Sequence, residues 1–575
     1  MEHQPPSTQS KLHNHSTDPA SLPQRIWKFK LHYLIVIPAL MLIFIFKLLP
    51  FANGIMMSFV DYKVFVGLFE STWVGFNHFA QLFDDEIFRR TIVNTFVIKA
   101  GYILVSGCIA FLLALALSSI RYKLLRELFS SLFLVPFFIP SFVFAFIFVY
   151  ILSESTSPFI TSGTLILADA SYIRPTIVFI EVLKTCGIPI VIALAAIASK
   201  HASVKRQNSE LKSSISYSAM NVIPALKAVA AFMVLQLSAI MSTDYELIRS
   251  LLNPLVSVTG ETLDSYIFKL GFLMMNVSPS AAAGVFQFVV QLLFTIIAYF
   301  IVKKLFLKQL FSEHTDAVIK TANKGRSLIG IVTACLYSIA VLFSLYMLFI
   351  YPFTGAREAG QSVWNFISFW NVFSYTVINF VAVIIFLLMT VTLAYPLTVK
   401  HLPGRSLYKL FLLIVISMGS GMINEYIFIR NLELVNTIFP QMFLGFFNLA
   451  AVFVLKSIFN GRHADLKAQA EASEKGELHT FFTLFIPKIW KPLLALGVLQ
   501  FVALWNSYLP SFIYTSQLEK QSPIMKLVQL ASSGEMDSTL MLQLGALLSL
   551  PSVILFLVFR KWLTSEVFIG QIRKL

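Results

Sequence analysis

Charged residues are scarce in this 575-residue chain. Asp, Glu, Lys and Arg make up 13% of it, whereas hydrophobic residues make up 57% and the mean hydropathy is +0.77. A single soluble core cannot bury that much apolar material. The composition therefore excludes a soluble globular protein and predicts an integral membrane protein.

Cysteines are also few, and the three present, Cys108, Cys186 and Cys335, lie inside apolar segments. Their spacing matches neither a zinc site nor a disulfide framework, so we expect them to pack as small apolar side chains. The sequence also lacks a G-x-x-x-x-G-K-[ST] phosphate loop and an H-E-x-x-H metal motif. We therefore expect no cofactor, metal site or catalysis in the chain itself.

Apolar runs of about 20 residues, long enough to cross a bilayer as helices, recur about twelve times. Residues 1–30 contain no such run and are rich in Ser, Pro, His and Gln, which predicts a disordered tail and excludes a signal peptide. The predicted fold is thus an all-α membrane protein with about twelve transmembrane helices. The predicted spans are 32–51, 91–118, 129–152, 173–199, 219–242, 279–306, 327–352, 371–398, 407–430, 434–458, 484–511 and 538–562.

The net charge of +15 comes from Lys and Arg that gather in alternate loops between these runs. Cationic loops are retained on the cytoplasmic side of a membrane, and both termini are predicted to lie there with them. The opposite loops hold fewer cations, and residues 153–172 hold none. The basic loops contain Arg121–Arg126, Lys200–Lys212, Lys303–Arg326, Lys400–Arg405 and Arg462–Lys475.

A short motif indicates that one module occurs twice. Ile223-Pro224 and Ile486-Pro487 each follow a large basic loop and open a long apolar run. Proline at the start of a helix loses no hydrogen bond, so each pair is expected to begin a membrane helix. We predict a cytoplasmic tail at 1–30, a first half at 31–308, a cytoplasmic linker at 309–326 and a second half at 327–575.

Several motifs in the two halves resemble carbohydrate-type ABC transporter permeases, as if two polysaccharide- or maltose-type subunits were fused. The resemblance covers residue 32 to the end and implies two six-helix halves of a type I importer. The first half contributes Phe59-Val60-Asp61-Tyr62, Ser71–Phe79, Asn94-Thr95 and Leu134–Pro140. The second half contributes Ala394–Leu397, Gly419–Asn424, Leu434–Thr437, Trp505–Tyr508, Leu550-Pro551 and Phe568-Ile569-Gly570.

The resemblance also implies that the loop before each Ile-Pro pair holds a coupling helix, with a Glu-Ala-Ala...Gly pattern, that docks on an ATPase subunit. Counted back from Pro487, the Glu-Ala-Ala positions fall on Ala468, Gln469 and Ala470, while the similar letters lie at Ala470–Gly476 and include Glu471 and Ala472. Counted back from Pro224, they fall on Lys205, Arg206 and Gln207, so the first loop has lost the pattern. Two couplings of unequal strength are expected.

Polar residues inside spans are the candidates for a substrate pathway, because they are costly in lipid and usually face a cavity or a partner. Glu181 and Lys184 stand three residues apart on one predicted helix, where they face each other or a ligand. Asn424 and Glu425, with Trp505 and Asn506, combine hydrogen-bonding and aromatic surface suited to a sugar. The alternative for all of them is structural pairing between helices.

The leading hypothesis is the translocation pore of a sugar importer in a bacterial plasma membrane. The implied partners are two ATPase subunits, which bind ATP and Mg, and an extracellular solute-binding protein. The alternatives are a secondary transporter, for which twelve spans and two similar halves are also expected, and a transport-derived sensor or regulator.

Overall fold

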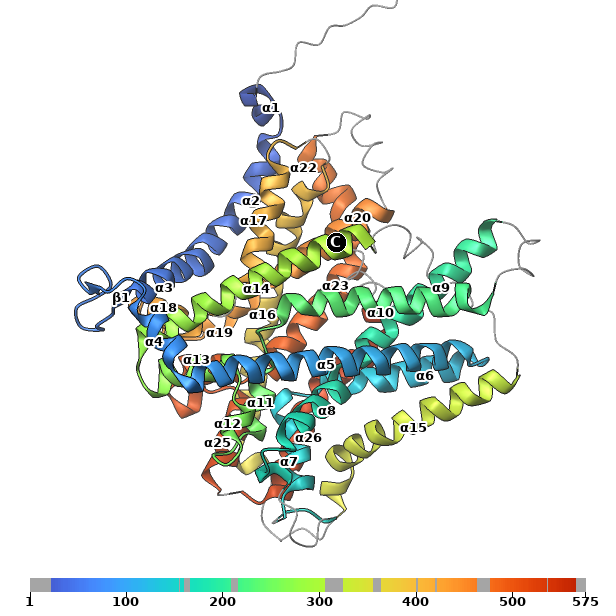
Figure 1. Cartoon of the computed structure of the whole chain (residues 1–575). Helices are drawn as coiled ribbons and strands as arrows, with labels where there is room; N and C mark the ends of the chain where they lie inside the picture. The colour runs from blue at the N-terminus through green and yellow to red at the C-terminus, as the bar shows by residue number, and fades with distance from the viewer. Residues whose placement is uncertain are drawn as a thin grey trace, which may run out of the picture.

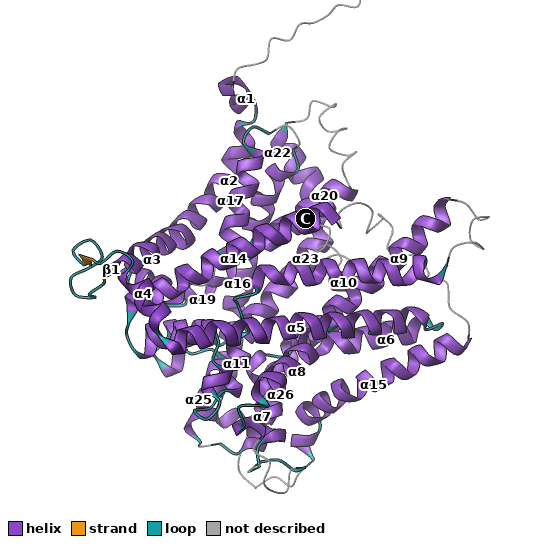
Figure 2. Ribbon diagram, in the orientation of Figure 1, coloured by secondary structure: helices purple, strands orange, loops and turns teal. Residues whose placement is uncertain are grey.

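The structure is a computed structural model, and it describes residues 22–154, 156–159, 166–207, 216–305, 324–354, 363–399, 402–418, 421–462, 476–534 and 536–564. Helices dominate these residues, and the strands among them form one short antiparallel pair, with Val60 opposite Trp73 (Figure 2). The all-α prediction is confirmed. We call the described residues before 306 the first half and those after 323 the second half.

The elements follow one another as a long series of helices (Figure 1). Those of the first half are α1 (Leu22–Lys28), α2 (Lys30–Ile43), η1 (Phe44–Leu48), α3 (Leu49–Phe59), β1 (Val60–Asp61), β2 (Thr72–Trp73), α4 (Asn77–Asp84), α5 (Glu86–Ser119), α6 (Lys123–Leu134), η2 (Val135–Phe138), α7 (Ser141–Leu152), η3 (Ile166–Ala168), α8 (Ile173–Thr185), α9 (Gly187–Gln207), η5 (Ser218–Val222), α10 (Ile223–Gln236), η6 (Leu237–Ala239), α11 (Tyr245–Leu251), α12 (Ser257–Gly260), α13 (Leu263–Phe268), η7 (Lys269–Leu273) and α14 (Val277–Leu305). Those of the second half are α15 (Lys324–Phe349), η8 (Tyr351–Phe353), η9 (Val363–Asn365), α16 (Phe369–Leu397), α17 (Arg405–Ser417), α18 (Met422–Asn431), α19 (Phe439–Phe443), η10 (Leu444–Phe447), α20 (Ala450–Arg462), α22 (Glu477–Thr480), η11 (Phe481–Phe485), α23 (Ile486–Asn506), α24 (Leu509–Tyr514), η12 (Leu518–Lys520), α25 (Pro523–Ser533) and α26 (Ser538–Trp562).

Nine helices in the described ranges are long and apolar enough to cross a membrane, and three bent pairs bring the number to twelve if each pair is one span. The prediction of about twelve helices is confirmed, but three expected straight spans are bent pairs. The third span of each half bends sharply, by 95° between α6–η2 and α7 and by 98° between α17 and α18. In the first half the bend falls at Pro140, whose ring and missing N–H stop a helix.

The fourth expected span, 173–199, also differs from the prediction. It divides at Cys186 into α8 and α9, and α9 alone of the two meets the length and hydropathy of a span. Near the N-terminus, α1 occupies residues 22–28, so helical structure begins inside the stretch expected to be a tail. The expected linker, 309–326, falls mostly outside the described residues, and α15 begins at Lys324.

The first long helix of each half packs against the opposite half. Helix α2 lies against α16, and α15 lies along α5 and α6, where Figure 1 shows it in yellow beside the blue α5. At the end of α5, the Ser119 hydroxyl donates to the carbonyl of Arg326, and the Arg121 amide donates to the Ser327 hydroxyl. The two halves are therefore interlocked by exchanged helices.

Each Ile-Pro pair begins an α-helix as expected, α10 at Ile223 and α23 at Ile486, but the helical backbone itself starts one π turn earlier. A π-helical turn precedes both pairs, as η5 before Ile223 and η11 before Ile486. The amides of Ile223 and Ile486 donate five residues back, to Ser218 and Phe481. The same device precedes Leu49-Pro50, where Leu49 donates to Phe44. The wider turn accommodates a proline that cannot join the usual four-residue ladder.

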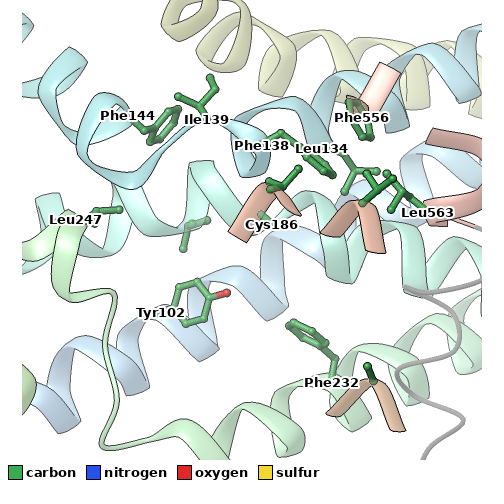
Figure 3. Packing of buried hydrophobic residues seen from close by; sticks show 14 of the residues in the cluster. Tyr102, Leu134, Phe138, Ile139, Phe144, Cys186, Phe232, Leu247, Phe556 and Leu563 are labelled. Carbon is green, nitrogen blue, oxygen red and sulfur yellow. The ribbon is translucent and has the colours of Figure 1, made fainter. Parts of the chain in front are cut away.

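The apolar core is continuous across the two halves. Phe138, from η2 of the first half, stacks on Phe556 of α26 with ring centroids 4.3 Å apart, and Figure 3 shows Leu134 and Leu563 beside them. Cys186 lies in this core, and its thiol donates to the Ser106 carbonyl at 3.6 Å. All three cysteines are free thiols, although Cys108 and Cys335 are exposed rather than buried.

Candidate functional site

Much of the two predicted coupling loops falls outside the described residues. This applies to Ala468, Gln469, Ala470, Glu471 and Ala472, and to the side chains of Lys205 and Arg206, whose backbone continues α9 to Gln207. Gly476, which ends the second loop, has φ −56° and ψ 150° and leads into α22. That conformation is open to any residue, so the turn there does not depend on glycine.

The predicted pathway residue Glu181 forms an ion pair with a residue that the sequence analysis missed. Its carboxylate lies 2.8 Å from the ammonium of Lys99 on α5, and both side chains are buried. Glu181 therefore pairs between two helices, α8 and α5, and the ion pair predicted between Glu181 and Lys184 is not formed among the described residues. The Lys184 ammonium instead lies 5.7 Å from the ring centroid of Phe137.

Asn424 and Glu425 lie on α18, where the two halves meet. Glu425 pairs with Lys47 of the first half at 2.6 Å, and Asn424 packs so closely on Gly54 that a Cβ there would lie 1.9 Å from its amide nitrogen. The Asn424 carbonyl oxygen is buried and has no hydrogen-bond partner among the described residues. This corner holds one satisfied charge pair and one free acceptor.

Trp505 and Asn506 end α23, and both are engaged by protein groups. The indole N–H of Trp505 donates to the Leu548 carbonyl at 2.9 Å, with 4% of the residue exposed. The Asn506 amide donates to the Phe138 carbonyl of the first half and accepts from the Ser552 hydroxyl. Asn506 thus joins the two halves, and a role of either residue in the pathway stays a prediction.

Glu246 on α11 also joins the two halves, by binding the residues that follow Asn506 in the chain. The sequence analysis did not select it. Its carboxylate accepts from the amides of Tyr508 and Leu509, each at 3.0 Å, and from the Ser507 hydroxyl. It therefore caps the start of α24 in the opposite half. Burial raises the pKa of Glu246 to about 7, against the lowering effect of the Ser507 hydrogen bond.

Further polar groups line the neighbouring interior. Asp264 accepts from the amide of Thr243 at 2.6 Å and from the side chain of Gln287 at 2.7 Å. A cavity of about 330 Å³ is bordered by Lys47 together with Asn448 and Gln500, whose side chains are joined by a hydrogen bond of 3.1 Å. Such hydrogen-bonding groups on an otherwise apolar wall are what a hydroxyl-rich ligand requires.

Two of the residues that the sequence analysis did not select, Lys99 and Lys47, could have been found from the sequence. Lys99 and Lys47 are isolated cations inside apolar runs, and an ionisable residue in a span is a candidate for function or pairing by default. Glu246 carries a weaker signal, because it lies just past a span in a polar stretch.

Each known protein described below matches less than half of the chain. Protein LplB of Bacillus subtilis (strain 168) is 26% identical over 287 residues, which is 47% of this chain and 88% of that protein. The polygalacturonan/rhamnogalacturonan transport system permease protein YteP of the same organism is 26% identical over 281 residues, 47% of this chain and 87% of that protein. The arabinooligosaccharides transport system permease protein AraQ of Halalkalibacterium halodurans is 27% identical over 229 residues, 39% of this chain and 78% of that protein.

The chain is a homologue of carbohydrate ABC transporter permeases. It is about twice as long as these permeases, as a fusion would be. A chain of the solved bacterial alginate ABC transporter, in complex with a pentasaccharide-bound periplasmic protein, matches with a TM-score of 0.43 and 24% identity, over 49% of this chain and 97% of that one. No family model matches the chain. With its homologues and its apolar helices, the chain is a multi-pass protein of the bacterial inner membrane.

Proposed function

We propose that the chain is the complete transmembrane pore of an ATP-driven importer for sugars, with oligosaccharides as the substrate class. Both halves line one pathway, and both termini lie in the cytoplasm. Two separate ATPase subunits bind ATP and Mg, and an extracellular binding protein delivers the sugar.

The observation that carries this proposal is the kinship with single permeases over most of their length, in a chain about twice as long. The structure supports a doubled module by repeating two backbone devices. The third span bends by 95° in one half and 98° in the other, and a π turn precedes Ile-Pro in both. A pore normally built from two subunits would then need no second permease chain.

The substrate class rests on the relatives. Two of them are permeases of transport systems for polygalacturonan/rhamnogalacturonan and for arabinooligosaccharides, so acidic and neutral glycans are both represented. The interior of the first half holds the cations Lys99 and Lys184, which suit an acidic glycan. Lys99 is already neutralised by Glu181, so we infer oligosaccharides as the class without assigning a charge.

Reconstitution tests the proposal. The chain is purified with a candidate ATPase and its binding protein, inserted into liposomes, and supplied with galacturonan or arabinan oligosaccharides. We expect ATP hydrolysis to rise when the binding protein carries its sugar, and labelled sugar to accumulate inside. A stable complex that is never stimulated, or no complex at all, would contradict the proposal.

The same liposomes separate the importer from a secondary transporter. A secondary transporter moves its substrate along a proton or sodium gradient without an ATPase. If an imposed gradient drives sugar uptake by the chain alone, the alternative holds. Uptake that requires ATP, the ATPase and the binding protein together excludes it.

A further inference from the structure

The exchanged helices α2 and α15 do more than interlock the halves. We propose that each of them positions the coupling loop of the opposite half, through His32 of α2 and Arg326 of α15. This inference rests on the proposed function, because it assigns these two side chains a role in transmitting ATPase motion to the pore.

The contact at the second loop is made by His32, Tyr395 and Glu477. Glu477 is the first residue of α22, directly after the predicted coupling loop. Its carboxylate lies 3.2 Å from Nε2 of His32 and accepts from the Tyr395 hydroxyl at 2.6 Å. The His32 and Tyr395 rings stack with centroids 5.3 Å apart and planes within 6°. A residue of the first half thus touches the exit of the second half's loop.

His32 is a buried polar side chain that is short of hydrogen-bond partners. None of its surface is exposed, and neither ring nitrogen makes a hydrogen bond of good geometry to a described residue. The 3.2 Å approach to Glu477 is therefore a close polar contact that is not fully aligned. Leaving a buried imidazole short of partners costs free energy, so a small shift of Glu477 relative to α2 changes the energy of this contact.

Tyr395 extends this contact to the proline-containing helix. Its ring meets Phe481 and Phe485 edge-on at 5.0 and 5.1 Å, and these two residues are the ends of the π turn that precedes Ile486-Pro487. Movement of the loop exit is therefore carried to α2, α16 and α23 together.

The first loop has an equivalent contact of different chemistry. Tyr217 lies next to η5 at the exit of that loop, and the guanidinium of Arg326 lies 4.7 Å from its ring centroid. Arg326 belongs to α15, the exchanged helix of the second half, and its carbonyl accepts from Ser119 of α5. Both contacts join an exchanged helix to the exit of a loop, although Tyr217 directly precedes its π turn whereas Glu477 lies four residues before its own.

Their strengths are unequal. The contact at the second loop is partly buried, with His32 fully buried and the Glu477 side chain 33% exposed, and it includes a charge-assisted hydrogen bond. At the first loop, Arg326 and Tyr217 are both exposed and make a cation–π contact. The structure thus adds a second asymmetry between the loops, independent of the lost sequence pattern in the first one.

The experiment measures sugar imported per ATP hydrolysed in the reconstituted complex. Tyr395→Phe removes the hydroxyl that holds Glu477, and His32→Phe keeps the stacking while it removes both ring nitrogens. Tyr33→Phe is the matched control, because its hydroxyl also joins α2 to the second half, by donating to Pro403 at 3.0 Å, but away from the loop. Arg326→Gln tests the first loop.

We expect Tyr395→Phe and His32→Phe to lower the sugar-to-ATP ratio by about fivefold, the lower end of usual coupling factors, with hydrolysis retained. Arg326→Gln should lower it less, and Tyr33→Phe should leave it unchanged. The His32→Phe/Tyr395→Phe double variant should lose less than the product of the single effects, because both act on Glu477.

Two results would overturn the inference. One is a ratio for Tyr395→Phe equal to that of Tyr33→Phe, and the other is a parallel loss of melting temperature, hydrolysis and import, which marks a purely structural contact. A native chain that shows no sugar-stimulated hydrolysis at all contradicts the proposed function instead, so the two failures are distinguishable.

Discussion

The two halves share an architecture but bury different chemistry. Among the described residues, the first half buries Lys99, Glu181, Lys184, Glu246 and Asp264, whereas the second half buries amides and hydroxyls and a single acidic side chain, Glu425. Even Glu425 takes its partner, Lys47, from the first half.

This difference shows that the two halves of a duplicated module can keep the same backbone features while the polar side chains in their interiors differ. Bent third spans and π turns recur in both halves because they depend on local backbone geometry. Buried charges depend on partners, since a charge in a span is tolerated only when it is paired or hydrogen-bonded. The first half therefore has the higher electrostatic cost and is the more sensitive to substitution.

Breaking the Lys99–Glu181 ion pair inside the first half should cause the largest loss of stability. Glu181→Gln leaves the buried Lys99 ammonium without its carboxylate, and removal of one partner from a buried pair costs about 3–5 kcal/mol. Asp264, whose carboxylate interacts with Lys99, should hold the loss near the lower value. Thermal unfolding in detergent measures it.

Gln500→Leu is the matched change in the second half. It removes the acceptor of Asn448 and the donor to the Gly445 carbonyl, and it leaves only neutral groups unpaired, at about 1–3 kcal/mol. An equal or larger loss for Gln500→Leu than for Glu181→Gln would remove the proposed difference between the halves.

A pH dependence should come from Glu246, the charge that joins the halves. Its pKa is raised from 4.5 to about 7, so the folded chain retains a proton that the unfolded chain releases. Stability should therefore fall as the pH rises from about 4.5 to 7, by up to about 3 kcal/mol, and stay low above that.

Glu246→Gln cannot ionise and should flatten this part of the profile. The measurement is the melting temperature from pH 4.5 to 8 for both proteins. Identical slopes would show that Glu246 is ionised throughout and that its hydrogen bonds to Ser507, Tyr508 and Leu509 outweigh its burial.

The packing of α15 against α5 should be weakened, and the protein destabilised, when a larger side chain blocks their close approach. A Cβ on Gly330 would lie 2.1 Å from the Ser119 hydroxyl and 2.3 Å from the Ala116 carbonyl oxygen, whereas one on Gly325 meets nothing within 4 Å. We expect Gly330→Val to cost about 1–3 kcal/mol and Gly325→Val much less. Melting temperatures of the two variants test this, and equal values would contradict the packing of α15 on α5.

Local patterns in the sequence predicted much of the fold, but relations between distant residues were not accessible. Apolar runs located the spans, yet hydropathy measures length and not direction, so the bends at Pro140 and before Met422 were missed. Glu181 was selected as important, but spacing on one helix suggested Lys184, because its real partner lies 82 positions away in the chain. The contact of His32 with Glu477 crosses from one half to the other, and no local pattern reports it.

Substitution of Trp505 should have the smallest effect on stability, and it tests whether this residue of α23 only packs inside the protein or contacts the sugar. Trp505→Phe removes the indole donor to Leu548 while keeping an aromatic ring, so the expected loss of stability is about 0.5–1.5 kcal/mol. Because the residue is 4% exposed, we expect the sugar concentration that half-stimulates ATP hydrolysis to stay unchanged. A raised half-stimulating concentration at unchanged stability would instead place Trp505 in contact with the sugar during transport, and the second half would then contribute an aromatic surface where the first contributes charge.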